Sequence, residues 1–514
     1  MFILALLIGL YSYSIFFLGL AHQLFKPQLS VISILLLLFT VYISLSYRPV
    51  LLIKLFVNKL YRLNKIGTVF LFFLIAQLLI NLIGSLGPEL SFDALWYHLT
   101  LPKMWLSQGH LSFYPGSVFK YSAMPMLTEM LYLPALALGS EVLAKFIHYL
   151  FGILTLIVTF KLSRKYLSIH YSLLTITILS SNLVFSWLQI TANIDLARTF
   201  FETLALYLFL DKKIYKSAVS LGLAASTKLL ALGSLPIYWI LAWRQKISFK
   251  YPIYYSLLTI TILSPWLLRS YLVTGNPVYP FLSPLYTDTR ISLNPTDLWT
   301  VFTRSADPVN PVYIISAPFI LFFLIRQNRS RGVANLGIYT GLALFVWFIT
   351  PRTGGGRFIL PYLPALSVLT AITIYRLQDK YIQKILIFIS LSLSLTSICY
   401  RLAANAKYIP VITRRQTKSD FLSLNLNYAS GDYYDTENFL AANVPPGSLI
   451  YVAGINNLFY LNYPFLHHSV SVVPPPTSYL LLRPSQTAFS PPPGWVLVHT
   501  SPLSQTRVYA PSQP

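Results

Sequence analysis

The chain has 514 residues, of which 55% are hydrophobic and only 10% are charged, and its formal net charge is +23. A soluble domain carries about 25% charged residues, so this composition argues against a soluble protein. The Lys and Arg residues stand in short loops between apolar segments rather than together on one soluble domain, which argues against a nucleic-acid binder. The single cysteine, Cys399, excludes an internal disulfide and a cysteine-based metal site.

Apolar segments long enough to cross a bilayer recur from residue 1 to about residue 404, which predicts an all-α polytopic membrane protein. The first segment lacks a basic n-region and a cleavage site, so we interpret it as a retained span. The segment 217–243 has basic residues on both flanks, and we predict a hairpin that turns near residues 231–234. About 11–13 membrane helices result. The other predicted spans are 1–21, 29–46, 67–86, 142–160, 171–190, 195–210, 251–268, 311–325, 333–350, 358–375 and 385–404.

Six loops between these spans are strongly basic and hold 20 of the 38 Lys and Arg residues, but only two acids, Asp211 and Asp379. The positive-inside rule places them in the cytoplasm. The intervening loops, including 87–141, and residues 405–514 are then expected outside the membrane. The basic loops are 47–66, 161–165, 211–216, 244–250, 326–331 and 376–384.

The longest outer loop, 87–141, carries Asp93 in an aromatic segment directly after a predicted span. The chain has only 15 acids, so an acid at this place indicates a functional role. Phe92, Trp96, Tyr97, Leu101, Met104 and Trp105 recur at near-helical spacing. This pattern predicts a helix in the membrane interface with its aromatic face in the headgroups, and residues 124–139 predict a second interfacial helix.

Residues 405–514 differ from the rest of the chain, because proline clusters separate short β-type segments such as 449–452 and 495–498. We predict a small extracytoplasmic α+β domain with a helix near residues 432–443. It contains no recognisable catalytic motif. His467 and His468 could bind a metal, but a pair of surface or turn histidines is the favoured interpretation.

Other ionisable residues are expected to face outside or to lie within the bundle. Asp195 stands where two spans meet outside, and a functional or an interfacial role is equally compatible with its position. Arg269 and Arg357 could each hold a phosphate through paired hydrogen bonds, or could anchor a span end to lipid headgroups. Lys228 stands just before the hairpin turn and needs an anionic partner there. Glu202 is expected to pair with a neighbour, and Glu129 to have a snorkelling or paired structural role.

In this order, these segments resemble the GT-C superfamily of integral-membrane glycosyltransferases. The likeness is to bacterial members related to the aminoarabinose lipid A transferase and the protein O-mannosyltransferases, and it covers residues 67–404. Its strongest match is Phe92-Asp93-Ala94-Leu95-Trp96-Tyr97-His98-Leu99 with Leu101-Pro102-Lys103. Weaker matches surround Asp195, Ser226-Thr227-Lys228, Pro265-Trp266-Leu267-Leu268-Arg269 and Arg357-Phe358-Ile359-Leu360-Pro361.

The resemblance implies a transmembrane glycosyltransferase domain at 1–404, with its catalytic loop at about 87–141, in the bacterial inner membrane. A polyprenyl-phosphate sugar would be the donor and a lipid, glycan or protein the acceptor, with Asp93 as general base. Arg357, Arg269 and Lys228 would bind the donor phosphate. Asp195, His98, Lys103 and Tyr97 would position substrate. Two departures are an additional span before the acidic loop and Ala94, where several relatives carry a second acid; the latter favours a metal-independent reaction without cofactor.

The main rival function is a transporter or flippase for a lipid-linked sugar, and a third is a membrane scaffold whose tail binds partners. A transporter would not need a long aromatic outer loop with a carboxylate or a soluble outer tail. Internal repeats, which are common in transporters, are not evident in this sequence.

The orientation generates the first prediction. A reporter enzyme fused after residue 514 that works only outside the cytoplasm should be active, because the positive-inside rule puts the tail outside. The matched measurement uses a reporter that works only in the cytoplasm, which should be inactive at the same position. Activity of the cytoplasmic reporter would overturn the orientation.

Overall fold

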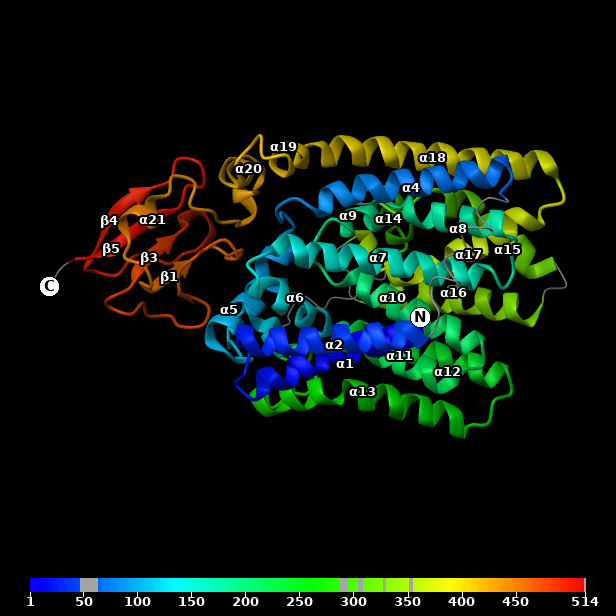
Figure 1. Ribbon diagram of the computed structural model, residues 1–514, viewed down its shortest axis with the longest axis horizontal. Coiled ribbons are helices and arrows are strands. Elements are labelled where there is room, and N and C mark those ends of the chain that lie inside the picture. Colours follow the sequence, from blue (N-terminus) through cyan, green and yellow to red (C-terminus); the bar gives the residue numbers. More distant parts are fainter. Residues whose placement is uncertain (47–62, 286–293, 304–307, 327–329, 351–354, 513–514) are drawn as a thin grey trace.

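A computed structural model describes residues 1–46, 63–285, 294–303, 308–326, 330–350 and 355–512 (Figure 1). A long bundle of helices carries a smaller domain with a β-sheet at one end. The bundle helices are α1 (Phe2–Leu20), α2 (Lys26–Ser46), α4 (Lys65–Ser85), α5 (Thr100–Gln108), α6 (Leu127–Ala137), α7 (Glu141–Ser163), α8 (Ile169–Ser180), α9 (Leu183–Leu188), α10 (Asp195–Leu210), α11 (Ile214–Thr227), α12 (Leu235–Arg244), α13 (Lys250–Thr274), α14 (Asp297–Thr303), α15 (Val312–Arg326), α16 (Arg331–Ile349), α17 (Leu363–Arg376) and α18 (Lys380–Ala406).

Six helices within the described ranges are long and apolar enough to cross a membrane, namely α1, α4, α7, α13, α16 and α18. The other predicted spans also coincide with helices, although 171–190 is divided into α8 and α9 by a break at residues 181–182. Polar side chains cap several helix starts: Ser140 accepts the Leu143 N–H at the start of α7, and Asp379 accepts two N–H groups at the start of α18. Long apolar runs therefore account for the bundle, and side-chain caps fix the starts of a few of its helices.

The segment 217–243 forms the predicted hairpin. Helix α11 ends at Thr227, and a 3-10 segment, η3 (Leu229–Ser234), leads into α12. Ile214 and Ala242, which stand near the two ends of this segment, line one small hollow together with Tyr251. The chain therefore enters and leaves the hairpin at the same end of the bundle, and the helical hydrogen bonds stop at Lys228.

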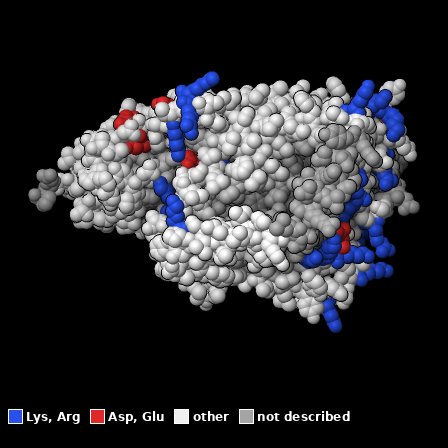
Figure 2. Space-filling model, viewed as in Figure 1, with Lys and Arg blue, Asp and Glu red and all other residues white. Residues whose placement is uncertain are grey.

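Basic residues gather at the end of the bundle that lies away from the sheet domain (Figure 2). The connections from α7 to α8, from α10 to α11 and from α17 to α18 meet at this end (Figure 1). Much of the predicted basic loop 47–66 and part of 326–331 lie outside the described residues. The described charges thus divide the molecule into a basic end and an end that carries the sheet domain.

The outer loop differs from the prediction of interfacial helices. Leu101 and Trp105 of α5 are fully buried, and the Trp105 indole N–H donates to the carbonyl of Ser112. Helix α6 is buried along most of its length and contacts α1, α2 and α7. The prediction of an aromatic face in the headgroups was wrong for these residues, because the same apolar spacing packs against the helix bundle instead.

The tail contains α19 (Tyr408–Ile412), α20 (Lys418–Asn425), α21 (Phe439–Asn443), β1 (Ile450–Ala453), β2 (Phe465–His467), β3 (Tyr479–Leu482), β4 (Trp495–Thr500) and β5 (Arg507–Pro511). Its sheet has the order β2-β1-β3-β5-β4, with β1 parallel to β2 and β3, and β5 antiparallel to β3 and β4. The predicted helix at 432–443 is shorter, because the Asp435 carboxylate accepts the N–H groups of Phe439 and Ala441 and helix begins only at Phe439.

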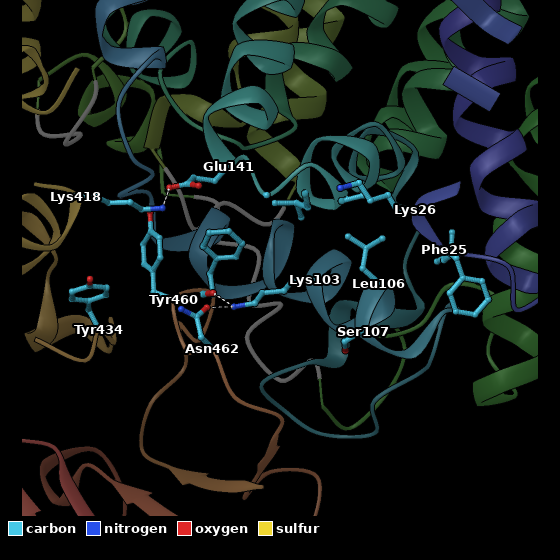
Figure 3. A pocket seen from close by; sticks show the side chains of 15 residues that line it. Phe25, Lys26, Lys103, Leu106, Ser107, Glu141, Lys418, Tyr434, Tyr460 and Asn462 are labelled. Carbon is cyan, nitrogen blue, oxygen red and sulfur yellow. Dashed lines mark hydrogen bonds and ion pairs between the residues drawn. The ribbon is translucent and has the colours of Figure 1, made fainter. Parts of the chain in front are cut away.

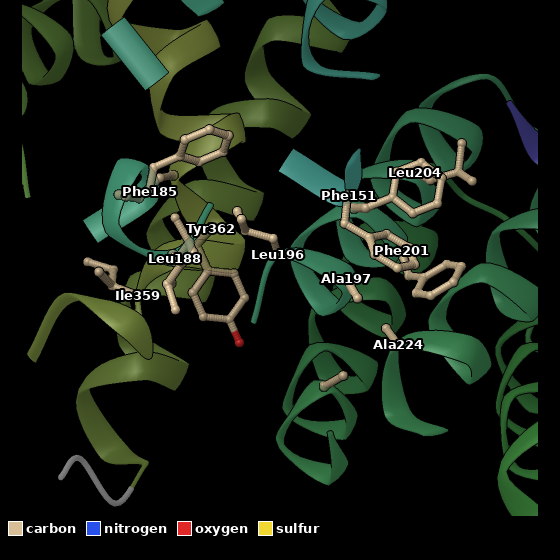
Figure 4. Packing of buried hydrophobic residues seen from close by; sticks show 14 of the residues in the cluster. Phe151, Phe185, Leu188, Leu196, Ala197, Phe201, Leu204, Ala224, Ile359 and Tyr362 are labelled. Carbon is tan, nitrogen blue, oxygen red and sulfur yellow. The ribbon is translucent and has the colours of Figure 1, made fainter. Parts of the chain in front are cut away.

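Buried side chains of α7, α9, α10 and α11 form the centre of the bundle (Figure 4). Phe201 of α10 lies with its ring centroid 6.0 Å from that of Phe151 of α7. Leu196 and Ala197, one to two turns earlier, are also fully buried. This packing holds the start of α10, where Asp195 stands, at a fixed place between its neighbours.

Removal of a buried ring tests this core. Phe201→Ala should lower the melting temperature of the purified protein strongly, because Phe→Ala in a core costs about 3–5 kcal/mol through lost contacts and an unfilled cavity. The matched control is Phe72→Ala on α4, whose side chain is 68% exposed, and which should melt close to wild type. Equal melting temperatures for the two variants would contradict this account of the core.

Candidate active site

Four charged side chains from four separate segments form one line of alternating charge. Arg357 Nη1 donates to Asp93 Oδ2 at 2.6 Å, and Arg357 Nε lies 3.3 Å from Asp195 Oδ2. Lys228 Nζ donates to Asp195 Oδ1 at 2.8 Å. Asp93 follows α4, Asp195 begins α10, Lys228 follows α11, and Arg357 ends a 3-10 turn, η4 (Gly355–Arg357). Sequence reasoning singled out all four residues, and the structure brings them together.

The local backbone explains the positions of Arg357 and the two aspartates. The turn before Arg357 uses Gly355 at φ +52°, which glycine adopts without a steric cost. Asp93 directly precedes a short π-helix, η1 (Ala94–His98), which carries Tyr97 and His98 on the same segment as the acid. Asp195 stands at the start of α10, where the first N–H groups of a helix favour a negative charge.

The loop that carries Asp93 is held by a buried acid, Glu89. Its carboxylate accepts the backbone N–H groups of Leu90, Ser91 and Ala192, so it joins residues 87–93 to the segment before Asp195. Lys145 of α7 donates to the carbonyls of Gly87 and Pro88 in the same loop and to that of Gly84 in the last turn of α4. These contacts fix the two aspartate-bearing segments relative to each other.

The tail also contacts this loop. The Tyr460 hydroxyl accepts the Glu89 N–H at 3.1 Å and donates to the Glu89 carbonyl at 2.9 Å. Lys103 of α5 donates to the carbonyls of Phe459 and Leu461 and to Asn462 Oδ1. The tail residues 459–462 are therefore part of the support of the candidate site.

Burial and charge act in opposite directions on Asp93. Burial raises the pKa of its carboxyl, but Arg357, together with His98 and Lys228, outweighs burial, so that the pKa lies below its usual value. Burial also lowers the pKa of Arg357, and Asp195 and Asp93 more than compensate and raise it. Asp93 is therefore ionised at neutral pH and is bound to a permanent cation.

A cavity of about 230 Å³ opens beside Asp93, Lys228 and Arg357. Five of the residues in its wall are aromatic, namely Trp96, Tyr97, Tyr121, Phe281 and Phe358. Polar groups at the wall include His98 and Glu129, with His98 Nδ1 2.7 Å from Glu129 Oε1. The lining residues are Asp93, Trp96, Tyr97, His98, Tyr121, Met124, Pro125, Met126, Glu129, Ile194, Thr227, Lys228, Leu229, Leu230, Phe281, Arg357 and Phe358.

Two of the predicted site residues lie elsewhere. Arg269 is buried and donates to the carbonyls of Leu111, Ser112 and Ser122, and it is not among the residues that line this cavity. Lys103 lines a separate cavity of about 620 Å³ between the tail and the helices (Figure 3). Burial and the nearby Lys418 lower the pKa of Lys103 to about 8. The contacts of both residues are structural.

No protein-family model and no curated protein sequence matches this chain. In three dimensions it is similar to ArnT from Cupriavidus metallidurans in the apo state, with a TM-score of 0.60 and 14% identity over 86% of this chain and 97% of ArnT. The chain has the ArnT fold. A structure of the same ArnT bound to undecaprenyl phosphate matches with a TM-score of 0.56 and 14% identity, over 87% of this chain and 98% of that chain.

The likeness to ArnT agrees, at the level of the fold, with the resemblance stated from the sequence, and it confirms the predicted fold class, a polytopic helical protein with a small α+β tail. Sequence reasoning gave little weight to Glu129 and did not single out Glu89. The scarcity of acids could have identified Glu89, which stands four residues before Asp93 in the same loop. The pairing of Glu129 with His98 depends on how α6 packs beside η1, and no spacing in the sequence indicates it.

Glu202 pairs as predicted, because its Oε1 accepts from Arg198 Nε at 2.6 Å and its Oε2 accepts from Ser234. Within the described part of the ArnT-like chain, no three His, Cys, Asp or Glu side chains are grouped as a metal site requires. In the tail, His467 bonds to Ser469 and to the carbonyl of Ile455, and His468 bonds to Tyr451. These histidines have partners within their own domain.

Loss of the shared cation provides a pH-dependent prediction. In wild type, the pKa of Asp93 is depressed, so its ion pair contributes stability at neutral pH that is lost only as the pH falls below the usual carboxyl range. In Arg357→Gln, burial of Asp93 is no longer opposed by the guanidinium. Its pKa should rise, and the variant should be about 3 kcal/mol less stable than wild type near pH 7.5.

The stability of Arg357→Gln should then recover as the pH falls from 7.5 to 5.5, because the folded state takes up a proton that the unfolded chain does not. Melting temperatures of both proteins across this range measure the effect. Arg415→Gln, at an exposed position in the tail, is the control and should follow wild type. A difference between wild type and Arg357→Gln that does not change with pH would contradict the prediction.

Proposed function

We propose that this chain is a membrane glycosyltransferase that moves a sugar from a polyprenyl-phosphate donor to a hydroxyl of a lipid, glycan or protein acceptor. The observation that carries the proposal is Asp93 held 2.6 Å from Arg357 at the wall of a cavity that aromatic rings line in part, on the ArnT fold. A carboxylate can remove the proton of an acceptor hydroxyl, and cations beside it can bind the phosphate of a donor. The structure of ArnT bound to undecaprenyl phosphate supports a polyprenyl phosphate as the lipid part of the donor.

In the proposed reaction, the donor phosphate competes with Asp93 and Asp195 for Arg357. As the guanidinium turns to the phosphate, Asp93 loses its strongest stabilising partner, and its pKa rises toward that of an effective base. Asp93 then takes the proton of the acceptor hydroxyl as the oxygen attacks the anomeric carbon, the bond to the phosphate oxygen breaks, and the configuration inverts. Arg357 and Lys228 stabilise the charge that develops on the leaving polyprenyl phosphate.

In this proposal, Asp195 orients the two cations, because it contacts both Arg357 and Lys228. Tyr97 and His98 line the cavity and position substrate. We assign no phosphate role to Arg269 and no substrate role to Lys103, since backbone carbonyls occupy both. The reaction as proposed uses the cations of the chain and no metal.

We further propose that the cavity faces the outside of the plasma membrane. The basic end of the bundle would then lie in the cytoplasm, as the positive-inside rule requires, and the sheet domain would lie outside (Figure 2). The sugar of the donor could then reach Asp93 at the outer face of the membrane. The polyprenyl chain of the donor would remain in the bilayer, beside the apolar helices.

The test is transfer by Asp93→Asn. Purified protein is incubated with undecaprenyl phosphate that carries a radiolabelled sugar and with an acceptor extract, and labelled product is measured. Removal of a general base costs about 10²–10⁴-fold in rate, so this variant should be nearly inactive although it folds. Asp420→Asn, on the exposed start of α20, is the control and should transfer at the wild-type rate.

Wild-type transfer by Asp93→Asn would refute the role of Asp93. Movement of the labelled lipid across liposomes that contain wild-type protein, without transfer to any acceptor, would favour a flippase.

A further inference from the structure

We propose that Glu129 and His98 form the subsite that binds two hydroxyl groups of the transferred sugar. This inference rests on the proposed function and names the part of the donor that the cavity recognises. It separates the cavity into two regions. Arg357 and Lys228 hold the phosphate, and Glu129 and His98 bind the sugar.

The first evidence is an incomplete pair. His98 Nδ1 and Glu129 Oε1 are 2.7 Å apart, and both side chains are almost completely buried. The second polar atom of each, His98 Nε2 and Glu129 Oε2, is also buried and has no hydrogen-bond partner among the described residues. A buried polar atom without a partner destabilises the folded state, so two such atoms on residues that line one cavity indicate a polar ligand.

Other buried acids in this chain show what a purely structural pair looks like. Both carboxylate oxygens of Glu202 have partners, one from Arg198 and one from Ser234. The Glu89 carboxylate accepts three backbone N–H groups. Neither of these acids lines the cavity beside Asp93, whereas Glu129 does and has one oxygen without a partner.

The chemistry of the pair defines what it binds. A carboxylate only accepts hydrogen bonds, so His98 Nδ1 donates to Glu129 Oε1, and His98 Nε2 is left without a partner. Glu129 Oε2 is left as a free acceptor. A hydroxyl group both donates and accepts hydrogen bonds, so two hydroxyls of one sugar ring can serve as the partners of these two atoms.

The remaining walls fit a sugar ring. Trp96, Tyr97 and Tyr121 form a cluster in which the ring centroids of Tyr97 and Tyr121 are 4.6 Å apart and those of Trp96 and Tyr121 are 5.3 Å apart. Aromatic rings offer flat apolar surface for the C–H groups of a sugar. The volume of about 230 Å³ is smaller than a pocket for a drug-sized ligand, which suits one sugar ring.

The experiment compares undecaprenyl phosphate with ligands that differ from it only by an attached sugar. Binding of undecaprenyl phosphate, and of undecaprenyl phosphates that carry glucose, mannose, galactose or arabinose, is measured with the full-length protein in detergent. Wild type should bind at least one sugar-bearing lipid more tightly than undecaprenyl phosphate. In Glu129→Gln, affinity for that lipid should fall by about tenfold or more, while affinity for undecaprenyl phosphate should not change.

A second variant protects the test against misfolding. His98→Asn keeps a short amide donor toward Glu129 and removes the unpartnered Nε2 atom, so it should show the same selective loss. Glu141→Gln is the matched control, because Glu141 is a largely buried acid that pairs with Lys418 at the other cavity, and it should bind both lipids as wild type does. A donor that lacks the hydroxyl bound by Glu129 should bind wild type more weakly than the complete donor does. Glu129→Gln should bind this donor and the complete donor equally well.

The other outcomes contradict either the sugar subsite or the proposed function. If both variants bind both lipids like wild type, or lose both equally, the sugar subsite is wrong while the proposed function stands. The subsite is also wrong if no sugar strengthens binding to wild type. If wild type binds none of these lipids, the proposed function itself fails.

Discussion

The site depends on one guanidinium that two carboxylates share. Asp93 and Asp195 come from segments about a hundred residues apart in sequence, and both would be costly to bury as unpaired charges. Arg357 contacts both, and Lys228 completes the pairing of Asp195. The alternation of charge makes the arrangement stable as a unit, and it also makes it responsive, because a phosphate that attracts Arg357 changes the environment of both acids at once.

This unit needs a rigid support, and Glu89 provides it. Its carboxylate joins the Asp93 loop to the segment before Asp195, while Lys145 binds two carbonyls of the same loop and one at the end of α4. The buried packing of α10 against α7 fixes the other side (Figure 4). Functional groups on a loop keep a defined position only when such contacts limit the movement of the loop. Here the contacts are made to backbone N–H and C=O groups, which a pattern of side chains in the sequence does not predict.

The sequence predicts the helices well, because long apolar runs with basic flanks have few alternatives in a membrane. It also identifies Asp93, Asp195, Lys228 and Arg357, since charges are rare in this chain and each stands at the end of an apolar segment. It does not predict which cations meet which acids. Arg269 and Arg357 look alike in sequence, yet one binds carbonyls and the other binds carboxylates. The prediction that Trp105 lies in the headgroups is wrong for a related reason. Periodicity shows that a helix face is apolar, but it does not show whether lipid or protein covers that face.

The contact between Tyr460 and Glu89 links residues that are 371 positions apart. A ribosome makes Glu89 before Tyr460, so while the residues between them are synthesised the Asp93 loop lacks the two hydrogen bonds between the Glu89 backbone and the Tyr460 hydroxyl. The loop can take its final form only after residues 459–462 have folded against it. A chain that is truncated before Tyr460 but still inserts its helices would therefore lack this support of the candidate site.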